Sequence, residues 1–294
     1  MAADLTVPWP APAKLNRFLH IVGRRDDGYH LLQTLFQFLD HGDRLRFVPR
    51  ADDRIRLYGG LAGLDPEQDL TVRATRLLQR HCGVDQGVEI HLDKRLPAGG
   101  GLGGGSSDAA TTLVALNHYW RAGLDLPGLA DLGLTLGADV PVFVHGRAAW
   151  AEGVGEQLHF VEPDEPWFLI LVPSCAVSTV AIFNAPDLTR DSRPTRIRAF
   201  IVDADRNDCE AAVFRSHPEV ARAARWLSRH GRARLTGTGG CVFAAFPERA
   251  QAEALLARRP AGVSGFVARG CNRSPLHERL RRATIDEYPF VTGP

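Results

Sequence analysis

Hydrophobic and polar residues follow two different spacings along this chain, which predict a mixture of strands and helices. Residues 14–22 alternate as a strand with one buried face does. Residues 70–82 carry apolar residues at helical spacing, and Gly83 follows as a stop signal. Pro141 disfavours a helix in the residue before it. We therefore predict further strands at residues 30–39, 43–49, 54–57, 88–92 and 141–145, and helices at residues 109–120 and 129–136.

An acidic, proline-rich segment at residues 161–166 marks a boundary between two predicted domains, residues 1–163 and residues 164–294. Beyond it strands and helices alternate, which favours an α+β sandwich of the ferredoxin-like type. The predicted strands are 167–172, 233–236, 241–246 and 263–268, and the predicted helices are 197–204, 207–215, 218–230 and 248–259. Residues 280–294 are expected to form a loosely held tail.

Composition narrows the class of protein. Of the 294 residues 45% are hydrophobic and 23% are charged, which excludes a disordered chain, a collagen and a coiled coil. The formal net charge of +1 argues against a general nucleic-acid binder. No apolar run approaches the ~20 residues of a membrane helix, and the N-terminus does not resemble a secretory signal. The five cysteines include no CxxC pair, so we expect a reduced, cytoplasmic protein. Its oligomeric state, monomer or homodimer, stays open.

The strongest local signal is a glycine cluster at residues 99–105, in which six of seven residues are glycine. The cluster lies between a predicted strand and a predicted helix, for which Ser106 or Ser107 is the expected N-cap. A backbone without Cβ atoms can bring several N–H groups to one anion, and a helix N-terminus adds positive partial charge. The cluster therefore predicts a phosphate-binding loop.

The common phosphate motifs do not explain this loop. A P-loop requires lysine where Gly105 stands. The dinucleotide pattern GxGxxG is met only formally by Gly99, Gly101 and Gly104, and Asp125, the acid at the expected distance, follows a predicted helix and not a strand. The protein-kinase motifs are absent. A nicotinamide-dependent oxidoreductase and a non-catalytic nucleotide-binding module stay open as alternatives.

Only two of the 35 cationic residues are lysines, Lys14 and Lys94. A general bias toward arginine explains the rest of the surface. A need for a compact ammonium group explains the two exceptions. Lys14 lies in a predicted strand with apolar neighbours, where an unpaired charge is costly.

Five motifs, in order, resemble the superfamily of galactokinase, homoserine kinase and mevalonate kinase. They are Pro12–Asn16, the pair Gly28–His30 and Gln33–Gln37, Pro97–Ser107, Leu136–Phe143 and Thr236–Cys241. The similarity extends from about residue 9 to about residue 277, and five ordered motifs are more specific than any one of them. The resemblance implies an α+β, two-domain small-molecule kinase with a ferredoxin-like C-terminal domain and an active site in the cleft between the domains.

Within this superfamily the motifs are most similar to a branch whose substrate carries a cytidine diphosphate. The resemblance implies ATP- and Mg²⁺-dependent phosphorylation of the 2-hydroxyl of 4-(cytidine 5'-diphospho)-2-C-methyl-D-erythritol, in the non-mevalonate isoprenoid pathway. It assigns Asp139 as the base that accepts the hydroxyl proton and Lys14 as its cationic partner. A kinase or decarboxylase acting on mevalonate, homoserine or a sugar is the alternative within the superfamily.

The resemblance also assigns binding residues. Tyr29, His30 and Phe183 match the cytosine pocket, where aromatic rings stack on the base. The other substrate-binding candidates are Asn16, Thr179, Gly237, Thr238 and Gly239. The ATP-binding candidates are Leu70, Lys94, Pro97, Gly99, Gly100, Gly101, Leu102, Gly103, Gly104, Gly105, Ser106 and Ser107. Mg²⁺ is expected to bind mainly through the ATP phosphates, with Ser107 as a candidate ligand. Asp69 and Asp108 stand where the family's pattern has asparagine, and their roles stay open.

Overall fold

The structure is a computed structural model that describes residues 7–195 and 206–287. Its strands are β1 (Trp9–Arg24), β2 (His30–Pro49), β3 (Ile55–Gly59), β4 (Val88–Asp93), β5 (Ala149–Glu152), β6 (Gln157–Phe160), β7 (Trp167–Pro173), β8 (Arg234–Leu235), β9 (Val242–Phe246) and β10 (Val263–Cys271). Its helices are α1 (Leu70–Cys82), α2 (Gly104–Tyr119), α3 (Leu126–Leu134), α4 (Val140–His145), α5 (Thr179–Phe183), α7 (Glu210–Ser216), α8 (Pro218–Leu227), α9 (Arg249–Ala257) and α10 (Pro275–Glu287), with the 3₁₀ turn η1 (Pro66–Gln68) before α1.

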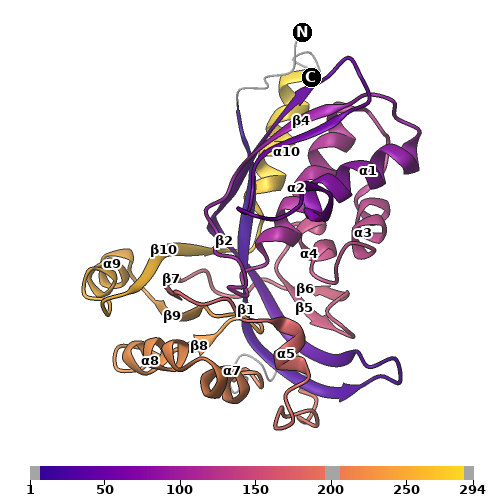
Figure 1. The fold of residues 1–294 in the computed structure, drawn as a ribbon. Helices are drawn as coiled ribbons and strands as arrows, with labels where there is room; N and C mark the ends of the chain where they lie inside the picture. The colour runs from indigo at the N-terminus through magenta and orange to yellow at the C-terminus, as the bar shows by residue number, and fades with distance from the viewer. Residues whose placement is uncertain (1–6, 196–205, 288–294) are drawn as a thin grey trace.

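A long antiparallel hairpin, β1 and β2, extends through the whole molecule (Figure 1). Near its open end, Phe36, Phe38 and Leu45 belong to the core that α1 and α2 cover. Near its turn, Leu19 and Ile21 belong to the second core, below β7 and β9. Because one pair of strands contributes to both cores, the hairpin holds the two parts of the molecule in a defined relative position.

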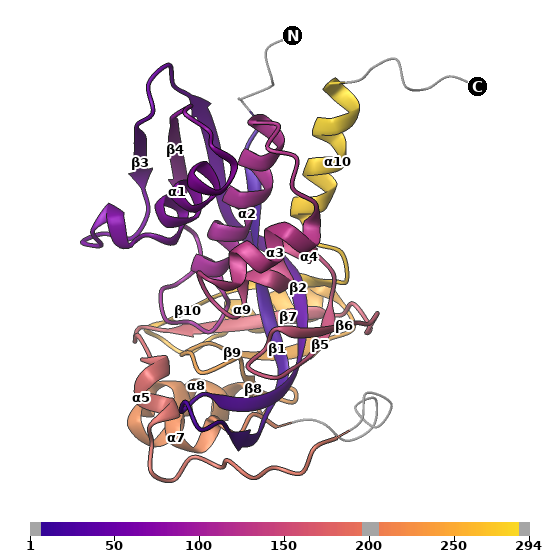
Figure 2. The same ribbon diagram turned by 90° about the vertical axis from the view of Figure 1, so that its right-hand side faces the viewer.

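The N-terminal part is a sheet whose one face is covered by helices. Strands β3, β4, β2 and β1 lie side by side, with β3 parallel to β4 and the other pairs antiparallel. Helices α1 and α2 pack together on this sheet (Figure 2). Helix α2 also contacts α3, α4 and α10, so its apolar residues, among them Ala109, Leu113 and Leu116, are buried.

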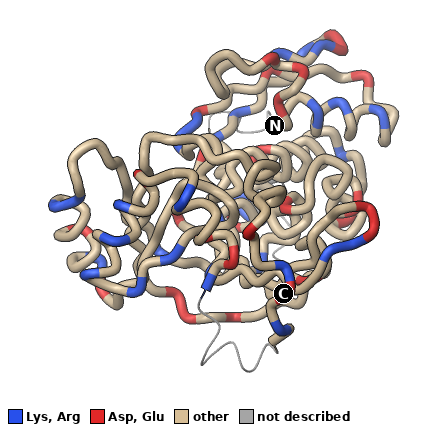
Figure 3. The backbone as a smooth tube through the Cα atoms, turned by 60° about the horizontal axis from the view of Figure 1, so that its bottom comes forward, with Lys and Arg blue, Asp and Glu red and all other residues tan. Residues whose placement is uncertain are grey.

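The C-terminal part is an antiparallel sheet in the order β10-β7-β9-β8, against which α8 and α9 pack. This arrangement confirms the predicted α+β sandwich. Strand β10 also pairs with β2 through Gly270 and Cys271, which joins the two sheets along one path. Basic and acidic residues are interspersed along the described chain (Figure 3), in keeping with its near-zero net charge.

Residues 141–145, predicted as a strand, form helix α4 instead. Pro141 stands in the first turn of this helix, where a missing N–H group costs nothing. Val140, Val142, Phe143 and Val144 are all buried, and a short run that is apolar on every side shows no period that separates strand from helix.

Several element boundaries also differ from the prediction. The strands predicted at residues 30–39 and 43–49 are one continuous strand, β2. Helix α2 begins at Gly104, with Gly103 as its N-cap, so neither Ser106 nor Ser107 caps it. The prediction of a loose tail is wrong for residues 280–287, because they belong to α10. This helix contacts β1 and α2. Residues 288–294 of the predicted tail and the helix predicted at residues 197–204 lie outside the described residues. None of the described helices has the length and the apolar character that crossing a membrane requires.

Candidate active site

A cavity of about 910 Å³ lies where the glycine loop, the turn of the β1–β2 hairpin and α5 meet. Most residues that the sequence analysis selected line it: Lys14, Asn16, Tyr29, His30, Leu70, Lys94, Pro97, Gly99, Gly100, Gly101, Leu102, Gly103, Gly104, Gly105, Ser106, Asp139, Thr179, Phe183, Gly237 and Thr238. Ser107 and Gly239 do not line the cavity. Ser107 is fully buried within α2, and Gly239 packs behind the loop.

The glycine loop, residues 99–105, is held by direct backbone contact with the second glycine motif, residues 236–241. The N–H groups of Gly240 and Cys241 donate to the carbonyl oxygens of Gly99 and Gly100, at 3.0 and 3.1 Å. A Cβ atom on Gly101 would lie 2.0 Å from the carbonyl oxygen of Thr236. Gly101 also has a φ of 77°, which side chains disfavour. Glycine is therefore required here for the contact between the two motifs as well as for an open loop.

Lys14 and Asp139 form an ion pair in the cavity wall. The Lys14 Nζ lies 3.2 Å from Asp139 Oδ2, and only 4% of the lysine side chain is exposed, against 32% for the aspartate. The backbone N–H of Lys14 donates to Leu102 at 2.9 Å, which fixes β1 against the glycine loop. Asp139 occupies the N-cap position of α4 but forms no capping hydrogen bond, so its carboxylate is turned to the lysine and not to its own helix.

Asn16 is tied into the protein by three hydrogen bonds. Its side-chain oxygen accepts from Lys14, its amide nitrogen donates to Thr34 Oγ1 at 2.9 Å, and its backbone N–H donates to Thr236 Oγ1 at 3.0 Å. The residue thereby joins the ion pair to the second glycine motif. Its side chain orients the Lys14 ammonium, a contact that the family motif alone did not reveal.

Lys94 is paired with two carboxylates beneath the start of α2. Its Nζ lies 2.8 Å from Asp108 Oδ2 and also contacts Asp43. Burial raises the pKa of Asp108 to about 8, although Lys94 acts in the opposite direction. Burial alone would lower the pKa of Lys94, but Asp108 and Asp43 raise it above its ordinary value. Lys94 is therefore held in place by two carboxyl groups of the protein itself.

The cytosine-pocket candidates meet at the turn of the hairpin. The rings of His30 and Phe183 are stacked, with centroids 5.0 Å apart and planes 16° from parallel. Tyr29 is 62% exposed, although the N–H group of Arg25 holds its backbone by donating to its carbonyl oxygen. The hydroxyl groups of Thr179 and Thr238 are 2.8 Å apart, which connects α5 to the second glycine motif.

Several residues of this site were not found from the sequence. Leu61 and Leu64 add an apolar border to the cavity, Gln68 adds a polar side chain, and Arg190 binds His30. No pattern indicates them, because they lie in connecting segments. Asp43 did carry a signal: Leu45 and Phe47 follow it at alternate positions, so an acid there faces inward.

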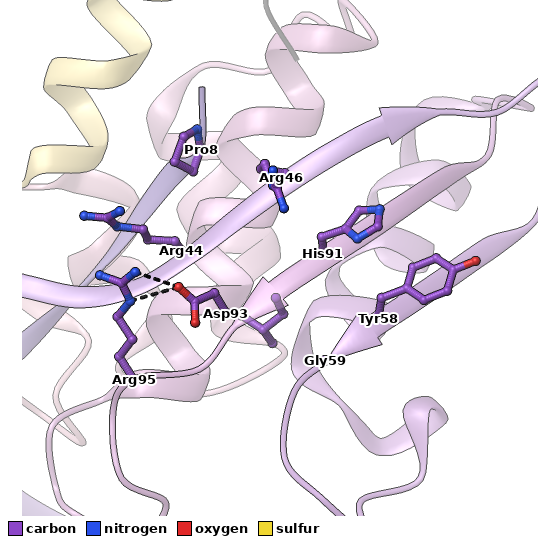
Figure 4. A pocket seen from close by; sticks show the side chains of 9 residues that line it. Pro8, Arg44, Arg46, Tyr58, Gly59, His91, Asp93 and Arg95 are labelled. Carbon is purple, nitrogen blue, oxygen red and sulfur yellow. Dashed lines mark hydrogen bonds and ion pairs between the residues drawn. The ribbon is translucent and has the colours of Figure 1, made fainter. Parts of the chain in front are cut away.

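A second hollow, of about 420 Å³, lies on the outer face of β2, β4 and β3 (Figure 4). Tyr58 stacks on His91 there, with ring centroids 4.9 Å apart, and Arg95 pairs with Asp93 at 2.7 Å. None of the predicted site residues lines this hollow. The cavity at the glycine loop is therefore the candidate active site.

Comparisons with known proteins agree with this geometry. Residues 69–147 match the GHMP kinases N terminal domain, and residues 187–263 match the GHMP kinases C terminal domain. A 4-diphosphocytidyl-2-C-methyl-D-erythritol kinase of Halorhodospira halophila is 56% identical over 278 residues, 94% of this chain and 96% of its own. One of Pseudomonas aeruginosa is 58% identical over 271 residues, 92% of this chain and 96% of its own.

Solved structures give the same result. A crystal structure of 4-(cytidine 5'-diphospho)-2C-methyl-D-erythritol kinase has a TM-score of 0.80 and 31% identity, and the match covers 90% of this chain and 99% of that one. A mevalonate kinase, at 17% identity and a TM-score of 0.65 over 91% of this chain and all of its own, shares the fold. The predicted superfamily is confirmed: the chain belongs to the GHMP kinases, and among them to the 4-diphosphocytidyl-2-C-methyl-D-erythritol kinase family.

Proposed function

We propose that this protein transfers the γ-phosphoryl group of ATP to the 2-hydroxyl of 4-(cytidine 5'-diphospho)-2-C-methyl-D-erythritol. The observation that carries the proposal is the Lys14–Asp139 ion pair, at 3.2 Å, in the wall of the cavity that the glycine loop also lines. Phosphoryl transfer to an alcohol requires a site for the phosphates, a proton acceptor and positive charge beside the reacting atoms. All three lie on this cavity.

The phosphates of ATP bind at the start of α2. Gly104, Gly105 and Ser106 form its first turn, and the first N–H groups of a helix have no acceptor within the helix. These groups and the helix dipole attract the β- and γ-phosphates. Leu70 and Leu64 line the cavity on the α1 side, where they provide an apolar surface for adenosine.

Asp139 and Lys14 perform the proton transfer and stabilise charge. The acceptor oxygen attacks the γ-phosphorus. The bond between the γ-phosphorus and the oxygen that bridges it to the β-phosphorus breaks, and ADP leaves. Asp139 takes the hydroxyl proton. Lys14 stabilises negative charge on the transferred group, which is most effective because its ammonium is nearly excluded from water.

Side-chain oxygen atoms suited to Mg²⁺ lie near the glycine loop. Ser107 Oγ and Asp108 Oδ1 are buried and have no hydrogen-bond partner among the described residues, and hydroxyl and carboxylate oxygens are suitable Mg²⁺ ligands. In its ionised form Asp108, which lines the cavity, would hold the ion together with the ATP phosphates, and Ser107, which does not line the cavity, stands next to it in α2 as the further candidate. When bound, it would neutralise phosphate charge.

We also propose the remaining features of the predicted enzyme. We place the boundary between an ATP-binding domain, residues 1–163, and a C-terminal domain, residues 164–294, in the segment between β6 and β7. The β1–β2 hairpin contributes to the cores on both sides of it, and α10 packs back on the N-terminal core. All five cysteines are free, which supports a reduced, cytoplasmic setting. The protein acts as a monomer or homodimer on a small cytidyl substrate, without a nucleic-acid partner.

A coupled assay of ADP release tests the proposal. The wild-type protein is offered the cytidyl methylerythritol, mevalonate, homoserine and galactose, each with ATP and Mg²⁺. Efficient turnover of the cytidyl substrate alone supports the proposal. Turnover of another alcohol with higher kcat/KM, or of none of them, contradicts it.

A further inference from the structure

Arg190 closes the end of the helix that carries Phe183. Its guanidinium group donates to three backbone carbonyl oxygens, those of Phe183 at 3.0 Å, Ala185 at 2.8 Å and Leu188 at 3.1 Å. The last carbonyl groups of a helix have no N–H donor within it, so they accept hydrogen bonds from donors elsewhere. One side chain therefore holds α5 and the residues after it in a fixed conformation.

The same guanidinium group also binds His30. Arg190 Nε donates to His30 Nε2 at 3.1 Å. Arginine keeps its protons and has no acceptor atom, so the imidazole nitrogen in this bond must be unprotonated. In a neutral histidine the proton then lies on Nδ1, and the ring is a hydrogen-bond donor at that nitrogen.

The surroundings of His30 favour this neutral form. Burial lowers the pKa of the imidazole, and the nearby Arg190 and Arg24 guanidinium groups lower it further. The charged groups that act on the ring are these two cations, from the segment after α5 and from β1. The imidazole is also held flat against Phe183 by the 5.0 Å stack.

We propose that Arg190 is a positioning residue for base recognition: it holds His30 as the Nδ1–H tautomer, a donor for the acceptor edge of cytosine, and fixes the Phe183 ring beside it. The inference rests on the proposed function. Cytosine presents two neighbouring acceptors, O2 and N3, whereas uracil has a donor N–H at N3. Both bases carry O2, so a histidine held as a donor favours cytosine over uracil through N3.

The tautomer is tested directly by long-range ¹H–¹⁵N NMR of histidine-labelled protein, with His30→Gln to assign the signals. In the wild-type protein at pH 7.5, we expect Nδ1 to be protonated and Nε2 unprotonated. In Arg190→Ala we expect both neutral tautomers in exchange. Arg190→Lys, which keeps a cationic donor without the planar fork, is expected to restore the Nδ1–H tautomer. Protonated Nε2 in the wild-type protein would overturn the inference.

Kinetics separate positioning from a purely structural role. In Arg190→Ala we expect KM for the cytidyl substrate to rise about tenfold, as the loss of one hydrogen bond would cause. The preference over the uridine analogue should fall, with kcat and KM for ATP unchanged. Arg259→Ala is the matched control, because Arg259 also binds two carbonyl oxygens, of Val263 and Leu256, but lies outside the cavity.

The possible failures are distinguishable. An unchanged KM for the cytidyl substrate in Arg190→Ala would overturn the inference. The inference would also be overturned if Arg190→Ala lowered kcat, the affinity for ATP and the melting temperature together, because that pattern indicates general destabilisation. If the wild-type protein does not phosphorylate the cytidyl substrate, the proposed function fails, while the NMR experiment still reports the tautomer.

Discussion

Asp139 Oδ2 lies 3.2 Å from Lys14 Nζ, and the contact joins the first strand of the chain to the start of α4. Lys14 also donates to Asn16 and to the carbonyl oxygen of Gly101, at 3.4 Å in the latter case. The ammonium group therefore contacts the proposed base and the proposed phosphate loop at once. This arrangement allows one buried charge to act on both reacting partners.

Replacing Asp139 by asparagine removes the proton acceptor and preserves the shape of the side chain. We expect kcat to fall about 10²- to 10⁴-fold, with nucleotide binding retained, because general base catalysis typically contributes this factor. Steady-state kinetics and ATP titration measure the two effects. Asp164→Asn is the control, since Asp164 is exposed and pairs with Arg17 outside the cavity. Near-normal turnover of Asp139→Asn would remove the residue from this role.

Lys14→Arg tests whether the site requires a compact cation. A Cβ atom on Gly103 would lie 3.1 Å from Lys14 Cε, and the ammonium lies 5.1 Å from the Phe36 ring centroid, so the wall has little space for a guanidinium group. We expect kcat to fall at least about 100-fold although the charge is kept. The reverse exchange outside the cavity, Arg17→Lys, should leave kcat unchanged. An active Lys14→Arg enzyme would contradict the prediction.

Gly101→Ala and Gly105→Ala compare a loop position where the structure leaves no space for a Cβ atom with one where it does. At Gly101 a Cβ atom would overlap the Thr236 carbonyl oxygen, at a φ of 77°. At Gly105 it would meet only Leu70 Cδ1, at 3.4 Å. We expect Gly101→Ala to lower the free energy of unfolding by about 1–3 kcal/mol or more, and Gly105→Ala to lower it much less. Urea titration measures both, and equal losses would contradict the contact.

Asp108→Asn should change the pH dependence of stability. Burial raises the pKa of Asp108 to about 8 from a model-peptide value of 3.8. Between these two pH values the folded protein keeps a proton that the unfolded chain releases, so this group's contribution to stability falls as pH rises up to about 8. Asparagine removes that dependence.

The measurement is urea unfolding of both proteins at several pH values from 5 to 9. We expect the stability of Asp108→Asn relative to the wild-type protein to increase with pH and to level off above about 8. A relative stability that does not vary with pH would show that Asp108 is already ionised in the folded protein at pH 5.

Tyr29→Ala tests the exposed ring of the cytosine pocket. Tyr29 is 62% exposed, so its removal should disturb the fold little and should raise KM for the cytidyl substrate, with KM for ATP unchanged. Tyr58→Ala provides the comparison, because Tyr58 is also exposed, at 44%, but lines the other hollow. If both variants have the wild-type KM, Tyr29 does not stack on the base.

Much of the site followed from local sequence. The glycine cluster at residues 99–105 and the helical spacing after it indicated a phosphate site, and the ordered motifs brought Lys14 and Asp139 together. The glycine cluster and the helical spacing can be read from the sequence, since backbone freedom and the spacing of apolar residues are properties of a few consecutive residues. The roles of the aligned residues could be inferred only through the resemblance.

The amino-acid sequence by itself determined the family, the glycine loop and most of the strands and helices, because these depend on short-range patterns. Only the tertiary structure decided that residues 140–145 are helical, that Asp43 and Asp108 contact the Lys94 ammonium, and that Arg190 binds His30. Each of these depends on burial or on a contact between distant segments. Such contacts have no periodicity along the chain, so they are visible only once the strands and helices have packed.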